Sequence, residues 1–197
     1  MPVHDEILMH VVARLDDETF IHCRRVKSLA LSLGKTAGLP PTELKLLGQG
    51  AFFHDIGKSF LPRDVLQKQA PLSPRDRAII KMHPKLGWDF AELIGLEEGV
   101  KRIILEHHLW ADGRDGYPDE LTGCKPCFLA QITAVADAVD SMTSDYRTAK
   151  SLDACLEYLE ENAGTKFSRT AVEIFKAAAS KGLVPLPQSA PVRSLSR

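Results

Sequence analysis

Histidine and acidic residues recur along the chain in an order that could hold metal ions. The residues concerned are Glu18, His22, His54, Asp55, His83, His107, His108 and Asp137. Five of the seven histidines belong to this set, so they are concentrated there rather than scattered. Imidazole and carboxylate together suit iron, manganese, nickel or zinc, whereas calcium prefers oxygen ligands and structural zinc prefers thiolates. The pattern therefore predicts a site for transition metals.

His54 and Asp55 are adjacent within a stretch that is otherwise apolar. Burying such a polar pair is costly unless something compensates, and a cation would do so. A carboxylate at Asp55 could bridge two cations about 3.5 to 4 Å apart, and a hydroxide held between them would attack phosphorus. Lys58, three residues after Asp55, could point to the same site and stabilise the growing charge on a phosphate oxygen. We therefore expect hydrolysis of a phosphoester, with Asp55 and Lys58 as catalytic residues.

The other ligand-type residues have spacings that helices could bring to one site. Glu18 and His22 are four residues apart, so they share a helix face and could bind one ion together. Glu18 could also be an ordinary acid in a first helical turn, where the helix dipole favours it. His107 and His108 are consecutive and cannot face the same way on a regular helix, so we expect each to serve a different metal.

The elements that must position these residues have helical periodicity. Apolar residues recur every three or four positions, as in Val26, Leu29, Ala30 and Leu33, while alternating strand patterns are scarce. Helices are expected to begin at Asp16 or Asp17, at Pro41, at Ser73 and near Leu96, and the helix that carries Asp137 is expected over 128–144. The sequence therefore predicts an all-α fold.

Breaks in helical structure are expected both before and after the paired histidines, His107 and His108. The helix that begins at Ser73 should carry His83, but Pro84 disfavours helical geometry at that histidine, so the helix is expected to kink or restart there. A loop rich in Gly, Asp and Pro is expected from 110 to 126. Two later amphipathic helices, about 151–162 and 166–181, carry no ligand-type cluster, and we interpret them as packing elements.

The length and charge of the chain fit a single domain. With 197 residues, 44% of them hydrophobic, the chain can bury one core. We expect residues 1–17 to be a short helical lead-in, 18–183 to be the domain that contains the site, and 184–197 to be a flexible tail. The 25 basic and 26 acidic residues nearly balance, which argues against long nucleic acid or an anionic membrane as a partner.

Targeting signals are absent from the sequence. No apolar run approaches the roughly 20 residues that span a bilayer, and the start of the chain lacks the basic and apolar regions of a signal peptide. We therefore expect a cytoplasmic protein.

In their order, these motifs resemble those of the HD-GYP domains, a branch of the HD phosphohydrolase superfamily. The resemblance extends from about Glu18 to Lys150, and its most specific motifs are His54-Asp55 and Gly116-Tyr117-Pro118. It implies a single-domain, HD-type helical bundle around a dinuclear or trinuclear centre of divalent metals, iron or manganese first, with nickel or zinc as alternatives. It also implies an enzyme, a phosphodiesterase that hydrolyses cyclic di-GMP to pGpG or GMP.

The resemblance also implies roles for residues around the centre. Glu18 and His22 match positions that complete a third metal site in some members. Arg147 and Lys150 have the spacing of a basic pair that holds substrate phosphates, and Lys58 would contact the same substrate.

Tyr117 lies in the tripeptide that gives the family its name. The resemblance suggests that it contacts the guanine or the ribose of the substrate. From residue chemistry alone, Gly116 and Pro118 could equally shape a turn over which Tyr117 packs. In relatives, the loop that carries the tripeptide is also linked to contacts with diguanylate cyclase domains, which are therefore candidate partners.

Three departures from the family pattern fall on the substrate side. Leu109 stands where relatives usually have Glu, the loop from Asp112 to Gly116 is one residue longer, and Arg147 sits one position late. They leave open another cyclic dinucleotide as substrate. They also leave open a general HD-superfamily nucleotide phosphohydrolase and a non-catalytic module that binds a cyclic dinucleotide or a cyclase.

Overall fold

The computed structural model describes residues 3–144 and 149–185, and every regular element within these ranges is a helix. This architecture confirms the predicted all-α fold class. Arg147 and most of the predicted tail, from residue 186 onward, lie outside the described residues, and the predicted boundary at residue 18 stays a prediction. Among the described helices, none combines the length and the apolar composition that crossing a bilayer requires.

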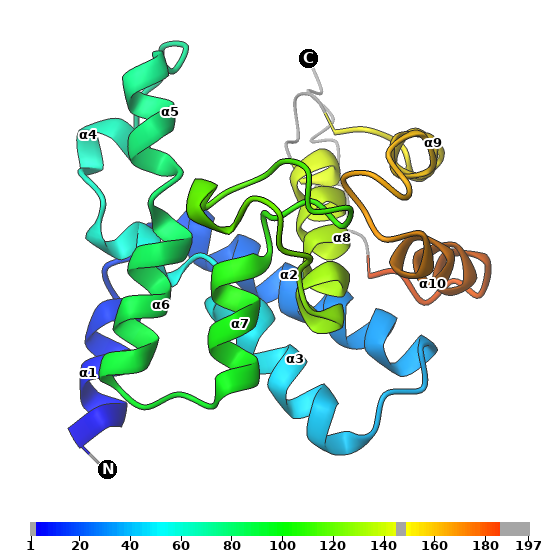
Figure 1. Ribbon diagram of the computed structural model, residues 1–197, viewed down its shortest axis with the longest axis horizontal. Coiled ribbons are helices and arrows are strands. Elements are labelled where there is room, and N and C mark those ends of the chain that lie inside the picture. Colours follow the sequence, from blue (N-terminus) through cyan, green and yellow to red (C-terminus); the bar gives the residue numbers. More distant parts are fainter. Residues whose placement is uncertain (1–2, 145–148, 186–197) are drawn as a thin grey trace, which may run out of the picture.

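The described chain forms ten α-helices and two short 3-10 helices (Figure 1). In chain order they are α1 (Val3–Val12), α2 (Asp17–Thr36), α3 (Pro41–Phe53), η1 (Ile56–Phe60), α4 (Arg63–Leu66), α5 (Pro74–Ile80), α6 (His83–Leu93), α7 (Glu98–Glu106), η2 (Asp119–Leu121), α8 (Phe128–Thr143), α9 (Leu152–Glu161) and α10 (Arg169–Ser180).

The helices begin where the sequence places capping residues. The side chain of Asp16 accepts a hydrogen bond from the Thr19 amide at 2.7 Å and starts α2. Ser73 and Asp76 form a reciprocal capping box at the start of α5. The expected break at His83 is present, because α5 ends at Ile80 and α6 begins at His83 itself. Pro84 is tolerated there because the first amides of a helix have no intrahelical partner.

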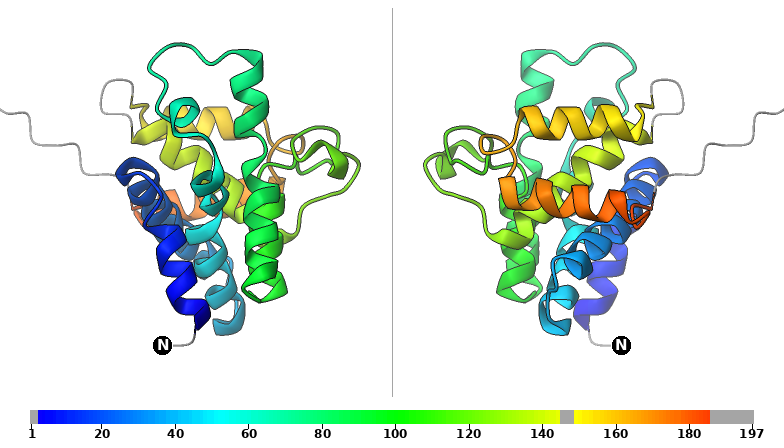
Figure 2. Two further views of the ribbon diagram at one scale, coloured as in Figure 1. Left: turned by 90° about the vertical axis from the view of Figure 1, so that its left-hand side faces the viewer. Right: turned by 90° about the vertical axis from the view of Figure 1, so that its right-hand side faces the viewer.

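Two apolar clusters hold the helices together. The larger cluster consists mainly of side chains from α2, α3, α8 and α10, such as Leu47, Val135 and Phe175. The smaller cluster consists mainly of side chains from α1, η1, α6 and α7, such as Ile56 and Phe90. Each large side chain that is fully buried in this way contributes about 1.5–3 kcal/mol. Figure 1 shows α8 between α7 and the pair α9 and α10, and Figure 2 shows that pair lying across the other helices.

The helices α3 and α7 belong to both clusters. On α7, Ile103 packs in the larger cluster and the next residue, Ile104, packs in the smaller one. Each of these two helices ends at a predicted ligand, with His54 as the C-cap of α3 and His107 as the C-cap of α7. The packing of two cores on shared helices therefore brings two ligand-type residues to the boundary between them.

Gly57 allows α6 to pack directly against η1. A Cβ atom at this position would lie 1.9 Å from the backbone oxygen of His83 and 2.7 Å from the amide nitrogen of Gly87. Only glycine permits this approach, which sets the first residue of α6 beside the residues that follow α3. The glycine of the His54-to-Lys58 motif therefore has a packing role that supports the position of His83.

Gly57→Ala should destabilise the protein by about 1–3 kcal/mol or more, because the added methyl group overpacks a backbone contact. Chemical denaturation of the two proteins measures this difference. Gly48→Ala is the matched control: on α3 its Cβ would meet only the side chain of Leu31 at 3.2 Å, and within a helix alanine is favoured over glycine by about 1 kcal/mol. Equal stability of the two variants would contradict the packing role of Gly57.

Candidate metal centre

Three buried histidines share one orientation. His54, His83 and His107 each lie at a helix terminus, and each places its Nδ1 atom near the backbone oxygen three residues earlier. These oxygens belong to Ala51, Ile80 and Ile104, at 2.9, 2.8 and 2.9 Å from the respective Nδ1 atoms. Because a backbone oxygen can only accept, Nδ1–H donates and Nε2 keeps its lone pair. This is the tautomer that metal ligation requires.

The Nε2 atoms of these histidines converge without hydrogen-bond donors between them. Nε2 of His54 is buried and has no hydrogen-bond partner. Nε2 of His83 and Nε2 of His107 lie 3.3 Å apart, although both carry lone pairs in this tautomer. Facing lone pairs and an orphaned buried nitrogen are unfavourable on their own. The donor set therefore fits divalent cations, whose positive charge would satisfy these atoms.

Asp55 separates two groups of ligand-type residues. Its Oδ1 atom lies 3.1 Å from Nε2 of His83, and its Oδ2 atom lies 3.4 Å from Nε2 of His54 and 3.8 Å from Nε2 of His22. We call His83, His107 and His108 the His83 group, and His22, His54 and Asp55 the His22 group. In each group the potential ligand atoms lie within 4.8 Å of one another. His107 and His108 fall in the same group, whereas the sequence led us to expect that each would serve a different metal. One carboxylate oxygen thus faces each group, as a bridging ligand would.

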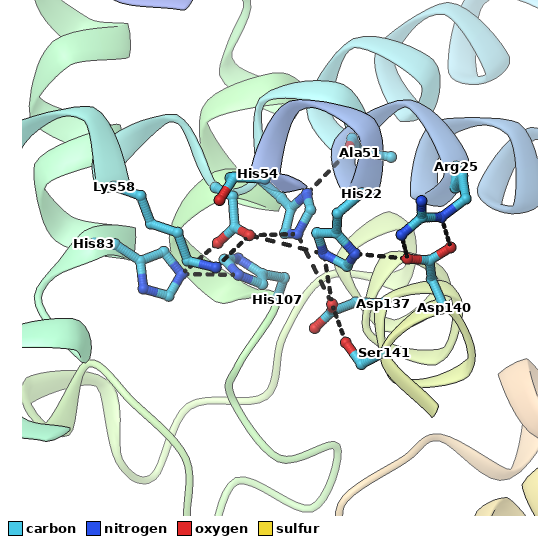
Figure 3. A network of polar contacts seen from close by, with 12 residues as sticks. His22, Arg25, Ala51, His54, Lys58, His83, His107, Asp137, Asp140 and Ser141 are labelled. Atoms are coloured by element: carbon cyan, nitrogen blue, oxygen red, sulfur yellow. Dashed lines mark hydrogen bonds and ion pairs between the residues drawn. The ribbon is translucent and has the colours of Figure 1, made fainter. Parts of the chain in front are cut away.

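Asp137 and Lys58 complete the inner surface of the centre (Figure 3). Asp137, on α8, places Oδ1 at 3.1 Å from Nε2 of His22 and 4.0 Å from Nε2 of His54. Nζ of Lys58 donates to Oδ2 of Asp55 at 2.7 Å, and a quarter of its side chain stays exposed. The structure therefore brings both residues to the histidines of the two groups, and their roles stay predictions.

The sequence-based prediction omitted two residues that support the His22 group. Asp140 accepts a hydrogen bond from Nδ1 of His22 at 2.7 Å, and Arg25 donates to both oxygens of Asp140 at 2.7 and 3.0 Å. A carboxylate behind an imidazole orients the ring and increases its basicity. The signal was available, because Asp140 lies one helical turn after Asp137 and Arg25 lies one turn after His22.

Glu106 is a second supporting acid that the prediction omitted. It is buried at the end of α7, accepts the amide of Cys127 at 2.6 Å and forms an ion pair with Arg102 at 2.7 Å. Cys127 is the N-cap of α8, so this hydrogen bond ties the start of α8 to the residue before His107. No spacing in the sequence links Glu106 to Cys127, because the two lie in different elements.

Tyr117 packs against the His83 group. Its ring centroid lies 4.4 Å from that of His108 and 6.1 Å from that of His83. Gly116 holds the loop at this position: its φ is 110°, and a Cβ atom there would lie 2.4 Å from the backbone oxygen of His108. Both readings of the tripeptide therefore fit, since Tyr117 packs over the turn and also borders the centre.

The other predicted residues differ in where the structure places them. Glu18, one turn before His22 on α2, is exposed and belongs to neither group, so its part in a third metal site stays a prediction. Lys150 is exposed and lines a pocket of about 420 Å³ that also reaches His107, His108 and Asp137. Arg147 lies outside the described residues.

Burial and charge give the His83 group and His22 opposite proton affinities. Burial lowers the pKa of His83 to about 4 and that of His108 to about 3, and it lowers the pKa of His107 well below its ordinary value. Burial also disfavours the charged form of His22, but hydrogen bonds with Asp137 and Asp140 outweigh it and raise its pKa to about 10. At neutral pH the His83 group is therefore unprotonated, while His22 holds a proton.

Cation binding by the two groups should respond differently to pH. His22 must lose its proton to bind a cation, so affinity of the His22 group should rise about tenfold per pH unit between about pH 6 and about pH 8. The His83 group has no proton to lose in this range, so its affinity should change little. Calorimetric titration with Mn(II) at several pH values measures both steps.

A His22→Gln variant serves as the control for this titration, because it removes the group that carries the proton. This variant should lose the cation-binding step whose affinity depends on pH and keep the step whose affinity does not. Equal pH dependence of both steps in the unmodified protein would contradict the assignment.

Comparison with known proteins gives a consistent family. A sequence profile of the HD domain matches residues 6–171. The chain is 31% identical over 172 residues to the cyclic di-GMP phosphodiesterase response regulator RpfG of Xanthomonas campestris, covering 84% of this chain and 45% of that protein. It is 28% identical to 3'3'-cGAMP-specific phosphodiesterase 2 of Vibrio cholerae, covering 85% of this chain and 33% of that protein. The chain thus spans less than half the length of these relatives.

Solved structures share the fold. The HD domain of the phosphodiesterase PgpH of L. monocytogenes superposes with a TM-score of 0.65 at 19% identity, covering 93% of this chain and 99% of that one. Bd1817 of Bdellovibrio bacteriovorus, described as an HDG"Y"P protein, has a TM-score of 0.66 at 23% identity, covering 82% of this chain and 52% of that one. These structures show the fold, and the profile match and the 31% identical relative show that the chain belongs to the HD domain family, in the HD-GYP branch that its motifs resemble.

Proposed function

We propose that this chain is a metal-dependent phosphodiesterase that hydrolyses a cyclic dinucleotide, with cyclic di-GMP as the first candidate. The observation that carries the proposal is the position of Asp55, which turns one oxygen to each of two groups of imidazole nitrogens. Two adjacent cations held in this way suit the in-line displacement of a phosphodiester. Relatives named as cyclic di-GMP phosphodiesterases, 31% identical in one case, support the choice of substrate.

The ligand set that we propose consists of the eight residues predicted from the sequence. These are Glu18, His22, His54, Asp55, His83, His107, His108 and Asp137. Its mixture of imidazole and carboxylate favours iron or manganese, with nickel or zinc as alternatives. When bound, such cations would supply the positive charge that activates water and stabilises the non-bridging phosphate oxygens.

Protein groups would position the substrate and balance its charge. A quarter of the Lys58 side chain is exposed, so its ammonium beside Asp55 could reach a phosphate oxygen. The buried surroundings would strengthen the electrostatic effect of this ammonium. Although burial favours its neutral form, the charge of Asp55 raises the pKa of Lys58, so the ammonium persists at neutral pH. Tyr117 would pack against a base or ribose, and Lys150 would bind a phosphate in the adjoining pocket.

3'3'-cGAMP is a second candidate substrate. Relatives with that name are 28% identical to this chain, and three departures from the family pattern lie on the substrate side. One departure has a physical consequence: Leu109 is buried and pairs with Gly116, so this position offers no carboxylate to a ligand. Binding of diguanylate cyclase domains by the tripeptide loop stays a prediction.

Product analysis tests the proposed activity. The Mn(II)- or Fe(II)-loaded protein should convert cyclic di-GMP to pGpG or GMP, and Asp55→Asn should reduce the rate on the order of a thousandfold or more because it removes the bridging charge. Asp64→Asn, an exposed acid on α4, is the control and should keep full activity. Chromatography of the products provides the measurement.

Two results of this assay would point to the alternative functions. Consumption of a mononucleotide, with every cyclic dinucleotide left intact, would indicate a general nucleotide phosphohydrolase. Tight binding of a cyclic dinucleotide without turnover, across anaerobic Fe(II), Mn(II) and Ni(II) preparations, would indicate a binding module.

The number of bound ions tests the role of Glu18. Protein purified without air should hold three ions per chain, and Glu18→Gln should hold two, because the third site loses its only acidic ligand on α2. Mass spectrometry of the metals provides the count, and Glu157→Gln, an exposed acid on α9, is the control. Two ions in both the unmodified protein and Glu18→Gln would remove Glu18 from the ligand set and leave the dinuclear centre unaffected.

A further inference from the structure

The pocket beside the metal centre has a second wall, which comes from the end of the chain. The lining of the pocket includes His107, His108 and Asp137. It also includes Tyr158 on α9, and Lys166 and Phe167 in the loop between α9 and α10. We call these last three residues the carboxy-terminal wall. The interpretation of the last helices as packing elements is therefore incomplete, since α9 and the loop after it also border the pocket.

Backbone hydrogen bonds tie the carboxy-terminal wall to the loop that follows the paired histidines. The amide of Ala111 donates to the backbone oxygen of Lys166 at 3.1 Å, and the amide of Asp112 donates to that of Thr165 at 3.1 Å. Ala111 lies only three residues after His108. The position of Lys166 relative to the His83 group is thus set by the backbone rather than by a flexible tether.

Contacts with two aromatic residues also restrict the side chain of Lys166. Its Nζ atom donates to the hydroxyl oxygen of Tyr158 at 2.9 Å. The same atom lies 5.3 Å from the ring centroid of Phe167. The hydrogen bond and this cation–π contact hold the ammonium in place. One of its three N–H groups is used, so two can donate to a ligand.

Within residues 3–144 and 149–185, the charge of Lys166 has no acidic partner. Lys101 and Lys176 both form ion pairs with glutamates, whereas no carboxylate of the described residues lies within 4.0 Å of Nζ of Lys166. A half-buried ammonium that is preorganised but not neutralised suits an anionic oxygen of a ligand. The pocket thus offers a second cationic donor, on the carboxy-terminal wall, in addition to Lys150.

A cyclic dinucleotide contains two phosphodiesters in one ring. If one of them lies at the metal centre beside Lys58, the other must lie elsewhere in the same pocket. We propose that Lys166, held by Tyr158, binds the phosphate that is not being cleaved, and so favours cyclic dinucleotides over substrates with a single phosphodiester. This inference rests on the proposed function, and its test separates the two.

The test compares two substrates in the Mn(II)-loaded full chain. Lys166→Gln should raise KM for cyclic di-GMP roughly tenfold or more, because it removes a charge-assisted hydrogen bond, and should leave kcat nearly unchanged. Hydrolysis of bis(p-nitrophenyl) phosphate, which has one phosphodiester, should be unaffected and so reports that the fold and the centre are intact. Tyr158→Phe keeps the ring but frees the lysine, so it should give a smaller rise in KM.

Lys45→Gln is the matched control, because this exposed lysine pairs with Glu97 away from the pocket and should change neither substrate's kinetics. An unchanged KM for cyclic di-GMP in Lys166→Gln would overturn the proposal. An equal loss on both substrates would also overturn it, because it would place the effect at the centre or in the fold.

Binding measurements distinguish failure of this proposal from failure of the proposed activity. A phosphorothioate analogue of cyclic di-GMP should bind the unmodified protein more tightly than it binds Lys166→Gln. The ratio of the two dissociation constants should be the same for the adenine analogue, because both ligands have the same phosphates. This ratio tests the role of Lys166 even if the protein hydrolyses neither ligand. A ratio that differs between the bases would assign Lys166 to base recognition, and absence of binding by the unmodified protein would overturn both proposals.

Discussion

A buried carboxylate surrounded by unprotonated imidazole nitrogens is the arrangement on which the rest of the structure depends. Burial would raise the pKa of Asp55, but Lys58 and the histidines around it together outweigh burial and hold that pKa well below its ordinary value. The Nε2 atoms of His54, His83 and His107 point inward because their Nδ1 atoms donate to backbone oxygens. Concentrating acceptors in this way is unfavourable in a dry interior unless a cation joins them. The site is therefore built for cations before any substrate is considered.

The helical framework holds these donors by their backbone. Each of the three histidines sits at a helix terminus, where the backbone oxygen three residues earlier is within reach of its ring. Gly57 lets α6 approach η1 closely enough for His83 to face Asp55. Glu106 and Asp140 fix α8 and the ring of His22, respectively. Few of these contacts involve the atoms that would bind a metal. The positions of those atoms therefore follow from the packing around the centre.

Different parts of the chain form the metal centre and the part of the pocket where we propose that the substrate binds. The donor atoms come from α2 to α8, whereas Tyr158 and Lys166 come from α9 and the loop after it. Under the role proposed for Lys166, this division separates metal binding from the selection of the substrate.

The sequence alone determined the fold class, the helix starts and the identity of most ligand-type residues, because these depend on local spacing and capping. Adjacent His54 and Asp55, and the family motifs in order, were enough to predict a metal centre of the HD type. The sequence could not show that Asp55 divides its oxygens between two groups, that Asp140 supports His22, or that Lys166 reaches the pocket. Those relations join residues far apart in the chain, as with His22 and Asp140, which are separated by 118 positions. The packing of the helices in the two apolar clusters decides these relations, because spacing along a sequence carries no information about which helix faces meet.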